Sequence, residues 1–213
     1  MSVLFFLLGF SACKRNPVER LTNPMSESAV PQSAAIYTIY DEELKTGGGL
    51  GFIPSGDNQS INLADQTSPR RTVNAIGYTW NGNDPSPGNH LFAGFSLLIT
   101  PNFTNLTSAM GKDLSASGYT KMKFFIRGAL SSHTTLRIEG PDDGDGGITP
   151  SRTELTSTDL TSDWRAVTLN ITPSHFNNVK VFATFSFQYA QPPRTTNAGE
   201  GGTIYIDDIQ YEP

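Results

Sequence analysis

Two adjacent aspartates near the end of the chain have the most constrained chemistry in this sequence. They stand in TIYIDDIQY, an alternating run over Thr203–Tyr211 that is typical of a β-strand. Alternation places Asp208 on the face of Ile204 and places Asp207 on the face of Tyr205. One carboxylate therefore points toward the interior whichever face is buried, and an unpaired charge there is costly. It requires a cation, a hydrogen-bonded partner or a position at the open end of the strand.

A second group of candidate residues surrounds a tryptophan in the segment GYTWNGNDPSPGNH. Flat aromatic rings stack on the apolar face of a sugar, while amides and acids hydrogen-bond its hydroxyl groups. Alternation of the preceding run puts the tyrosine and the tryptophan of this segment on one face. The candidate ligand contacts here are Tyr78, Trp80, Asn81, Asn83 and Asp84. An equally open interpretation is that both rings cap a hydrophobic core.

The run VKVFATFSFQYA offers a further polar surface, because its side chains alternate between two faces. One face carries Val181, Ala183, Phe185, Phe187 and Tyr189, and the other carries Lys180, Phe182, Thr184, Ser186 and Gln188. Gln188 is a candidate ligand contact, since its face could form the floor of a cleft. Arg127 and Arg137, on neighbouring predicted strands, are further candidates, and Arg127 could instead pair with a carboxylate at the sheet edge.

Catalytic motifs are missing from the sequence. It has three histidines and contains no GxSxG, HExxH or phosphate-binding loop. A glycosidase needs only two carboxylates about 5–10 Å apart, and the sequence alone does not exclude such a pair. The acids stand mainly in predicted loops, however, and Glu139 is the one candidate in the middle of a predicted strand. We therefore expect a protein that is not an enzyme.

Composition and charge limit the class of protein and its partners. Glycine and proline number 20 and 14 among 213 residues, and only 16% of residues are charged, so turns are frequent and the surface is mostly neutral. The net charge is −5, and no basic stripe is present, which excludes a nucleic-acid partner.

Short alternating or apolar runs separated by Gly, Pro, Asn and Asp clusters predict about eleven strands. No stretch holds a helical period. Such a pattern in one domain predicts an all-β fold, a two-sheet antiparallel β-sandwich. The predicted strands are Ile36–Asp41, Gly49–Ile53, Ser60–Leu63, Val73–Trp80, Gly94–Thr100, Lys121–Arg127, Thr134–Glu139, Arg152–Thr156, Trp164–Asn170, Lys180–Ala190 and Thr203–Tyr211.

The chain begins with an apolar run, MSVLFFLLGFSA, that is too short to span a bilayer and has the length of a signal-peptide core. The only cysteine, Cys13, follows it, and the arrangement resembles a bacterial lipoprotein signal cleaved before a lipidated cysteine. Residues 1–13 are therefore predicted to be a signal peptide, 14–34 a flexible linker and 35–213 the folded domain. The expected location is extracytoplasmic, at a membrane held by the lipid anchor. The alternative is a free cysteine buried in an apolar segment.

Five segments, taken in order, resemble the galactose-binding-domain-like jelly roll shared by many bacterial carbohydrate-binding modules. They are IYTIYDEELKTGGGLGF, SINLAD, DLSASGYTKMKFFIRG, LTSTDLTSDWRAVTLNI and GGTIYIDDIQYEP. Together they span nearly all of the chain from Ile36 onward, although Phe92–Met110 has no counterpart. The resemblance implies a jelly-roll fold and non-catalytic binding of a polysaccharide or oligosaccharide. Alternatives are a surface or periplasmic lipoprotein that binds a protein partner and, less favoured, a small glycan-active hydrolase or lyase.

The resemblance also implies roles for single residues. Many of these modules hold a structural calcium ion between the acidic end of the first strand and the first aspartate of the last-strand pair. Those positions are Asp41 or Glu42 and Asp207 in this sequence. Carboxylate and carbonyl oxygens suit calcium. The alternative for Asp207 is a strand-end acid in water or hydrogen-bonded to a loop. Trp164 matches a position that packs in the core.

Overall fold

A computed structural model describes residues 35–53, 59–81, 92–189 and 201–213, all within one compact unit, Ser33–Pro213. These residues form twelve strands and three short 3-10 helices. The strands are β1 (Tyr37–Asp41), β2 (Glu43–Leu44), β3 (Gly49–Ile53), β4 (Gln59–Asp65), β5 (Ala75–Trp80), β6 (Phe92–Leu98), β7 (Lys121–Leu130), β8 (Thr134–Glu139), β9 (Arg152–Leu155), β10 (Arg165–Asn170), β11 (Val181–Tyr189) and β12 (Gly202–Glu212). The helices are η1 (Phe103–Asn105), η2 (Ser115–Ser117) and η3 (Pro173–Phe176).

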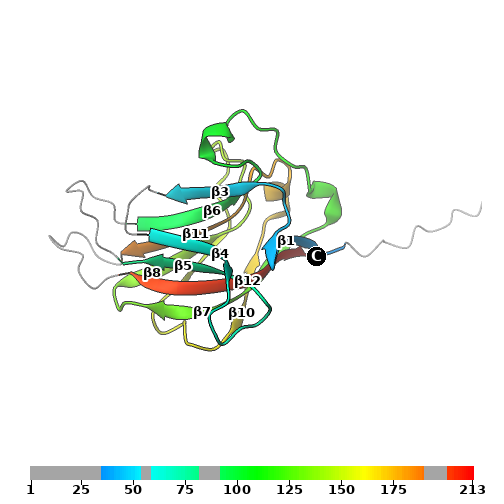
Figure 1. Ribbon diagram of the computed structural model, residues 1–213. Coiled ribbons are helices and arrows are strands. Elements are labelled where there is room, and N and C mark those ends of the chain that lie inside the picture. Colours follow the sequence, from blue (N-terminus) through cyan, green and yellow to red (C-terminus); the bar gives the residue numbers. More distant parts are fainter. Residues whose placement is uncertain (1–34, 54–58, 82–91, 190–200) are drawn as a thin grey trace, which may run out of the picture. The chain divides into compact units, whose positions relative to one another are not determined.

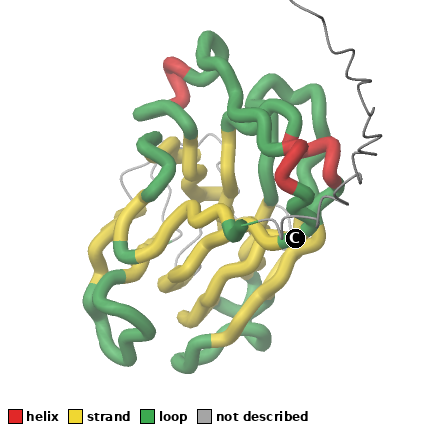
Figure 2. The backbone as a smooth tube through the Cα atoms, turned by 90° about the vertical axis from the view of Figure 1, so that its right-hand side faces the viewer, coloured by secondary structure: helices red, strands yellow, loops and turns green. Residues whose placement is uncertain are grey.

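The strands form two antiparallel sheets. The five-stranded sheet has the order β3-β6-β11-β8-β9, and the seven-stranded sheet contains β10-β7-β12-β1-β2, with β5 beside β12 and β4 beside β5 (Figure 1). The described helices are single short turns at the margins of the strands (Figure 2). Each of the eleven predicted strands overlaps an observed one, so the predicted two-sheet all-β sandwich is confirmed. Only the two-residue strand β2 was not predicted.

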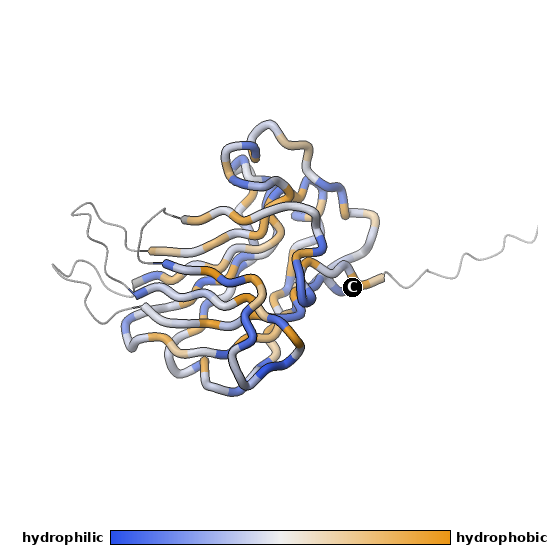
Figure 3. The backbone as a smooth tube through the Cα atoms, in the orientation of Figure 1, coloured by the Kyte–Doolittle hydropathy of each residue, from blue (hydrophilic) through white to orange (hydrophobic). Residues whose placement is uncertain are grey.

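The core lies between the two sheets and is rich in aromatic rings. Apolar and polar residues alternate along many strands, as the colouring in Figure 3 shows, and the apolar ones face the other sheet. Tyr78 of β5 packs against the opposite sheet. Its ring centroid lies 5.1 Å from that of Phe95 on β6 and 5.3 Å from that of Phe187 on β11. Of the described residues, none belongs to a helix long and apolar enough to cross a bilayer.

The last strand, β12, changes neighbours along its length. Its first half, Gly202–Ile206, pairs with β5, whereas Ile209 and Tyr211 pair with β1. Between these halves the register against β7 is irregular from Asp207 to Gln210, and Asp208 has a left-handed φ of 50°. The aspartate pair of the sequence therefore lies at the break between two partner strands.

Tyr211 provides a test of the core. Its hydroxyl group donates a 2.6 Å hydrogen bond to the Phe182 carbonyl, and both side chains are fully buried. That carbonyl lies at an irregularity where the β11–β6 register shifts between Val181 and Ala183. Tyr211→Phe is expected to lower the free energy of unfolding by about 1–3 kcal/mol, because a buried acceptor loses its donor. Urea unfolding would measure this, with the half-exposed Tyr205→Phe as control. Equal effects of the two substitutions would contradict the assignment.

Candidate functional site

The carboxylate of Asp207 is the centre of a buried polar cluster. Its side chain is fully buried, and one oxygen, Oδ2, lies 2.6 Å from the hydroxyl oxygen of Thr72. The other, Oδ1, accepts the backbone N–H of Asp208 at 2.8 Å. The Thr72 hydroxyl oxygen also lies 2.9 Å from the carbonyl oxygen of Asn74. The Thr72 hydroxyl oxygen therefore contacts both its own segment and a carboxylate far away in the sequence.

Hydrogen counting shows that these oxygens have one hydrogen too few to make both contacts hydrogen bonds. The Thr72 hydroxyl group has one hydrogen, which can be donated to Asp207 or to the Asn74 carbonyl but not to both. A proton on the Asp207 carboxyl group would supply the second hydrogen, and a cation among the oxygens would take its place. Burial raises the pKa of Asp207, which favours the proton when no cation is bound. The burial of Asp207 excludes a carboxylate in water, whereas its contact with Thr72 is the hydrogen bond to a loop that the sequence left open.

Glu42, between β1 and β2, reaches the same segment. It has a left-handed φ of 61°, and its two carboxylate oxygens accept the backbone N–H groups of Val73 and Asn74, each at 2.8 Å. The hydrogen bond from Val73 holds the pKa of Glu42 below its usual value. The Asn74 side-chain amide donates to the Glu42 carbonyl at 3.3 Å. Glu42 and Asp207 therefore meet at residues 72–74.

The third predicted metal ligand, Asp41, lies in the tight β1–β2 pairing opposite Glu43. No group of three or more His, Cys, Asp or Glu side chains within the described ranges is arranged to hold a metal ion. Of the predicted set Asp41, Glu42 and Asp207, the structure thus brings the last two together. The remaining oxygens at this place come from Thr72 and from backbone carbonyls.

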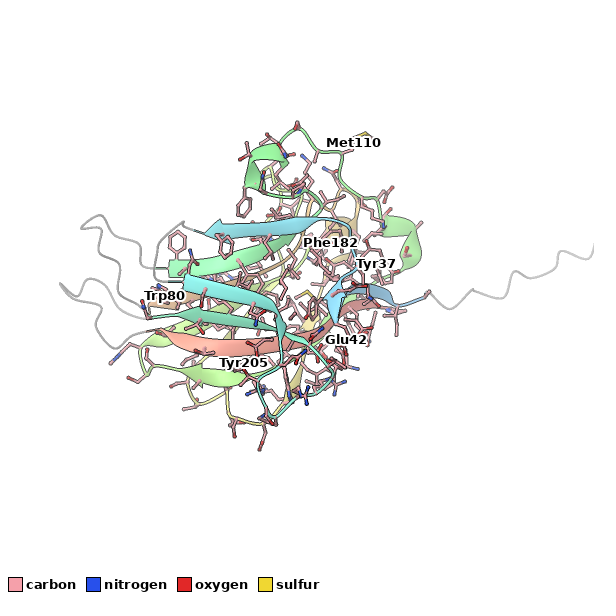
Figure 4. All side chains as sticks on the ribbon, viewed as in Figure 1. Tyr37, Glu42, Trp80, Met110, Phe182 and Tyr205 are labelled. Atoms are coloured by element: carbon pink, nitrogen blue, oxygen red, sulfur yellow. The ribbon has the colours of Figure 1, made fainter. Side chains whose placement is uncertain are left out.

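The rings of Tyr78 and Trp80 belong to the core. Tyr78 is fully buried, and Trp80 is 4% exposed with its ring stacked 6.0 Å from that of Phe187 (Figure 4). Their assignment as sugar-stacking platforms is wrong, and the alternative that both rings cap the core is confirmed. The face they share turns inward because β5 pairs with β12, whose Ile204 and Ile206 are also in the core.

The other residues predicted beside Trp80 are placed only in part. Asn81, directly after β5, is exposed. Asn83 and Asp84 lie outside the described residues, as does Cys13.

Gln188 lies on the outer face of the five-stranded sheet, as predicted. Beside it on β11 are Ser186 and Thr184, and the Thr184 hydroxyl group is 2.7 Å from that of Ser96 on β6. Ser96 and Ser186 are buried, so the centre of this face has small hydroxyl side chains below the level of larger neighbours. We call Phe92, Ser96, Arg137, Thr184, Ser186 and Gln188 the polar face.

An aromatic ring flanks the polar face on β6. Phe92 is 41% exposed and pairs directly with Gln188 across the strands. It shares its face with Ser96, because Ala93 and Phe95 between them point into the core. Sequence reasoning missed Phe92, since the predicted strand began at Gly94. The period-two pattern, extended by two residues, was the signal that could have found it.

Charged side chains flank the other side of the polar face. Arg137 on β8 pairs across the strands with Ser186, and its guanidinium group binds the Glu154 carboxylate at 3.1 Å. In the next row, Thr184 pairs with Glu139, which pairs with Arg152. The face therefore runs from an apolar ring through hydroxyl and amide groups to a neutralised ion pair. Arg137 is placed where the sequence suggested.

Arg127 lies on the outer face of the other, seven-stranded sheet. It is 5% exposed, and its guanidinium group lies 3.9 Å from the Tyr205 ring and 5.2 Å from the Trp164 ring. It donates to the Thr67 carbonyl at 2.7 Å, and the Trp164 indole N–H donates to the Pro69 carbonyl at 2.9 Å. Trp164 is therefore not in the core, contrary to expectation. Both side chains hold residues 67–69 against the sheet.

Arg127→Ala is expected to lower the free energy of unfolding by about 2 kcal/mol, through loss of the ring contact and the charge-assisted hydrogen bond. Arg127→Met should recover about half, because its chain still covers Tyr205 and no buried charge remains. Urea unfolding of both variants tests this. An alanine variant as stable as the wild type would show that this contact does not hold the segment.

Comparisons with known proteins bear on the fold. No protein-family model matches the chain, and no curated protein matches it. Among solved structures, it is similar to the family 30 carbohydrate-binding module of a cellulosomal cellulase of Clostridium thermocellum, with a TM-score of 0.47, 14% identity and coverage of 83% of this chain and 96% of that one. It is also similar to a xylan-binding domain from Paenibacillus barcinonensis, with a TM-score of 0.42, 9% identity and coverage of 84% and 93%.

A third similar structure is an exo-beta-agarase, with a TM-score of 0.48, 8% identity and coverage of 85% of this chain and 25% of that one. At these identities the likeness concerns the fold alone. The β-sandwich fold of this chain itself rests on the strand pairings described above.

Proposed function

We propose that this protein binds a polysaccharide or oligosaccharide without cleaving it, through the polar face. One observation carries the proposal: an exposed aromatic ring, Phe92, pairs across the strands with Gln188 at the edge of a floor of small hydroxyl side chains. A sugar ring has an apolar side and a rim of hydroxyl groups, and this arrangement complements both.

The residues of the polar face would contact different parts of a sugar. Phe92 offers its ring to the apolar side of a sugar, while Gln188 and Ser186 can donate to and accept from hydroxyl groups. The charge of Arg137 is neutralised by its ion pair with Glu154. The remaining N–H groups of Arg137 can donate to sugar oxygens. The small side chains in the centre let a chain approach the sheet.

We further propose a structural calcium ion at Asp207. The residues that would hold it are Asp207, Thr72, Asn74 and Glu42, the last two through their carbonyl oxygens. The support is the shortage of one hydrogen among the first three and the preference of calcium for such oxygens. When bound, the ion neutralises the buried carboxylate. The protein groups themselves join the break in β12 to residues 72–74.

We also propose that the protein is exported and anchored to a membrane by a lipid on Cys13, with the domain facing outside the cytoplasm. The support is the sequence of residues 1–34 alone. Labelled palmitate should enter the wild-type chain and not Cys13→Ala. Equal labelling of both chains would remove the proposal.

The binding proposal is tested by native electrophoresis through gels that contain plant, algal or microbial polysaccharides. The chain from residue 33 onward, which holds every described strand, should be retarded by at least one of them. Release of new reducing ends would contradict the non-catalytic assignment. A cooperatively folded domain that no glycan retards would favour a protein partner instead.

A further inference from the structure

A pocket of about 580 Å³ opens on the seven-stranded sheet where β5 ends and β12 begins. This volume is in the range of small-molecule sites. Thr79, Thr203 and Ala129 line it in one row of three neighbouring strands. They lie on the outer face, because Tyr78 and Ile204 beside them are in the core. The pocket is therefore on a different sheet from the polar face.

Two glycines stand where β12 begins, beside this pocket. Gly202 pairs with Trp80 on one side and with Leu130 on the other, and it has no room for a side chain, which would collide with the Ala129 carbonyl. Gly201 has a φ of 107°, which residues with side chains rarely adopt. Both positions at the start of β12 therefore require glycine.

The lining of the pocket indicates its ligand. Hydroxyl groups come from Thr79, Thr203 and Ser131, and an amide comes from Asn81. The Thr79 and Thr203 hydroxyl groups lie 2.9 Å apart, and this bond uses only one of their two hydrogens. Every lining residue that the structure describes is uncharged. A neutral ring with several hydroxyl groups fits this lining, and an anionic ligand would find no cation among its described residues.

We propose that this pocket binds one neutral sugar unit, independently of the polar face. The choice of a sugar rests on the proposed function, whereas the neutrality and the size rest on the pocket itself. With two sites on different sheets, the protein would hold a glycan network at two points, and the second contact would raise the overall avidity.

NMR titration of backbone amides tests the pocket. The probes are the methyl glycosides of glucose, galactose and xylose, with glucuronate as an anionic comparison. A neutral glycoside should shift the amides of Gly202, Thr203 and Asn81 in a saturable way at millimolar concentration, and glucuronate should not. Saturable shifts with glucuronate alone, or none with any methyl glycoside, would overturn the proposal.

A matched pair of variants assigns the shifts to the pocket. Ala129→Arg fills it from an exposed position and should weaken glycoside binding at least about tenfold. Ala166→Arg, an exposed position on β10 of the same sheet, should leave it unchanged. Unchanged binding by Ala129→Arg, with amide shifts elsewhere showing an intact fold, would also overturn the proposal.

The variant Phe92→Ala distinguishes binding at the polar face from binding at the pocket. This variant should lose polysaccharide retention and keep the glycoside shifts at the pocket. Pocket shifts in a protein that no polysaccharide retards would remove the proposed function and leave this inference standing. Retention by a polysaccharide without pocket shifts would support the proposed function and overturn this inference.

Discussion

Replacing Phe92 by alanine is expected to weaken binding of the retained polysaccharide at least about tenfold, equivalent to about 1.4 kcal/mol. A ring that stacks on a sugar contributes buried apolar area that alanine cannot supply. Because the ring is 41% exposed, the melting temperature should change little. Retardation in affinity gels and titration calorimetry would measure the loss.

Phe52 provides a matched control for this prediction. It is also a phenylalanine with 41% exposure, on the neighbouring strand β3. It pairs with Phe95, whose ring is in the core, so it lies on the opposite side of the sheet from Phe92. Phe52→Ala should keep glycan binding. Equal losses from the two variants would show that neither ring marks the site.

Removal of calcium is expected to lower the melting temperature by about 5–10 °C at neutral pH. A ligand present at about a hundred times its Kd adds about 2.7 kcal/mol to the folded state. A change of that size shifts the melting temperature of a domain of this length by a few degrees per kcal/mol. Calorimetric scans in calcium and in EDTA would measure the shift.

Two substitutions at adjacent aspartates locate the ion. Asp207→Asn should abolish most of the EDTA effect, while its amide can still donate to the Thr72 hydroxyl oxygen. Asp208→Asn should keep the effect, because that carboxylate binds Arg71 at 2.6 Å rather than Thr72. An EDTA effect that survives in Asp207→Asn would place the ion elsewhere.

The pH dependence in EDTA follows from the same carboxyl group. Burial raises the pKa of Asp207 in the folded state above its value in the unfolded chain. Its contribution to stability is therefore fully present below the unfolded value of about 3.9 and is lost as the pH rises through the folded value. Relative to Asp207→Asn, the wild type should lose stability as the pH rises from about 4. A constant difference between the two would contradict the raised pKa.

Local patterning explains why the strands could be predicted from the sequence. A period of two in β-branched and aromatic residues, interrupted by Gly, Pro, Asn and Asp, depends only on neighbouring residues. The position of Gln188 on an outward face followed from that period. The period did not decide the aspartate pair: with Ile204 and Ile206 inward it places Asp208 inside, whereas Asp207 is the buried one, because the register of β12 is irregular from Asp207 to Gln210.

A single irregularity limits what this period can predict. Counting by two places Val181 inward and Phe182 outward on β11. The register shift between Val181 and Ala183 reverses this, so Phe182 is fully buried in the main core, while Val181 packs with Leu98 and Leu106 in a separate cluster. A bulge depends on the partner strand, which the local sequence does not contain.

The sequence by itself determined the all-β class, the approximate strands and the residue types that suit a sugar. The tertiary structure decided which of those residues can meet one. Trp80 faces inward because of the strand beside it, whereas Phe92 is exposed on a sheet that places it opposite Gln188. Asp207 meets Thr72 only because β12 exchanges β5 for β1 at that point. These outcomes depend on pairings between residues far apart in the chain, and such pairings leave no local pattern.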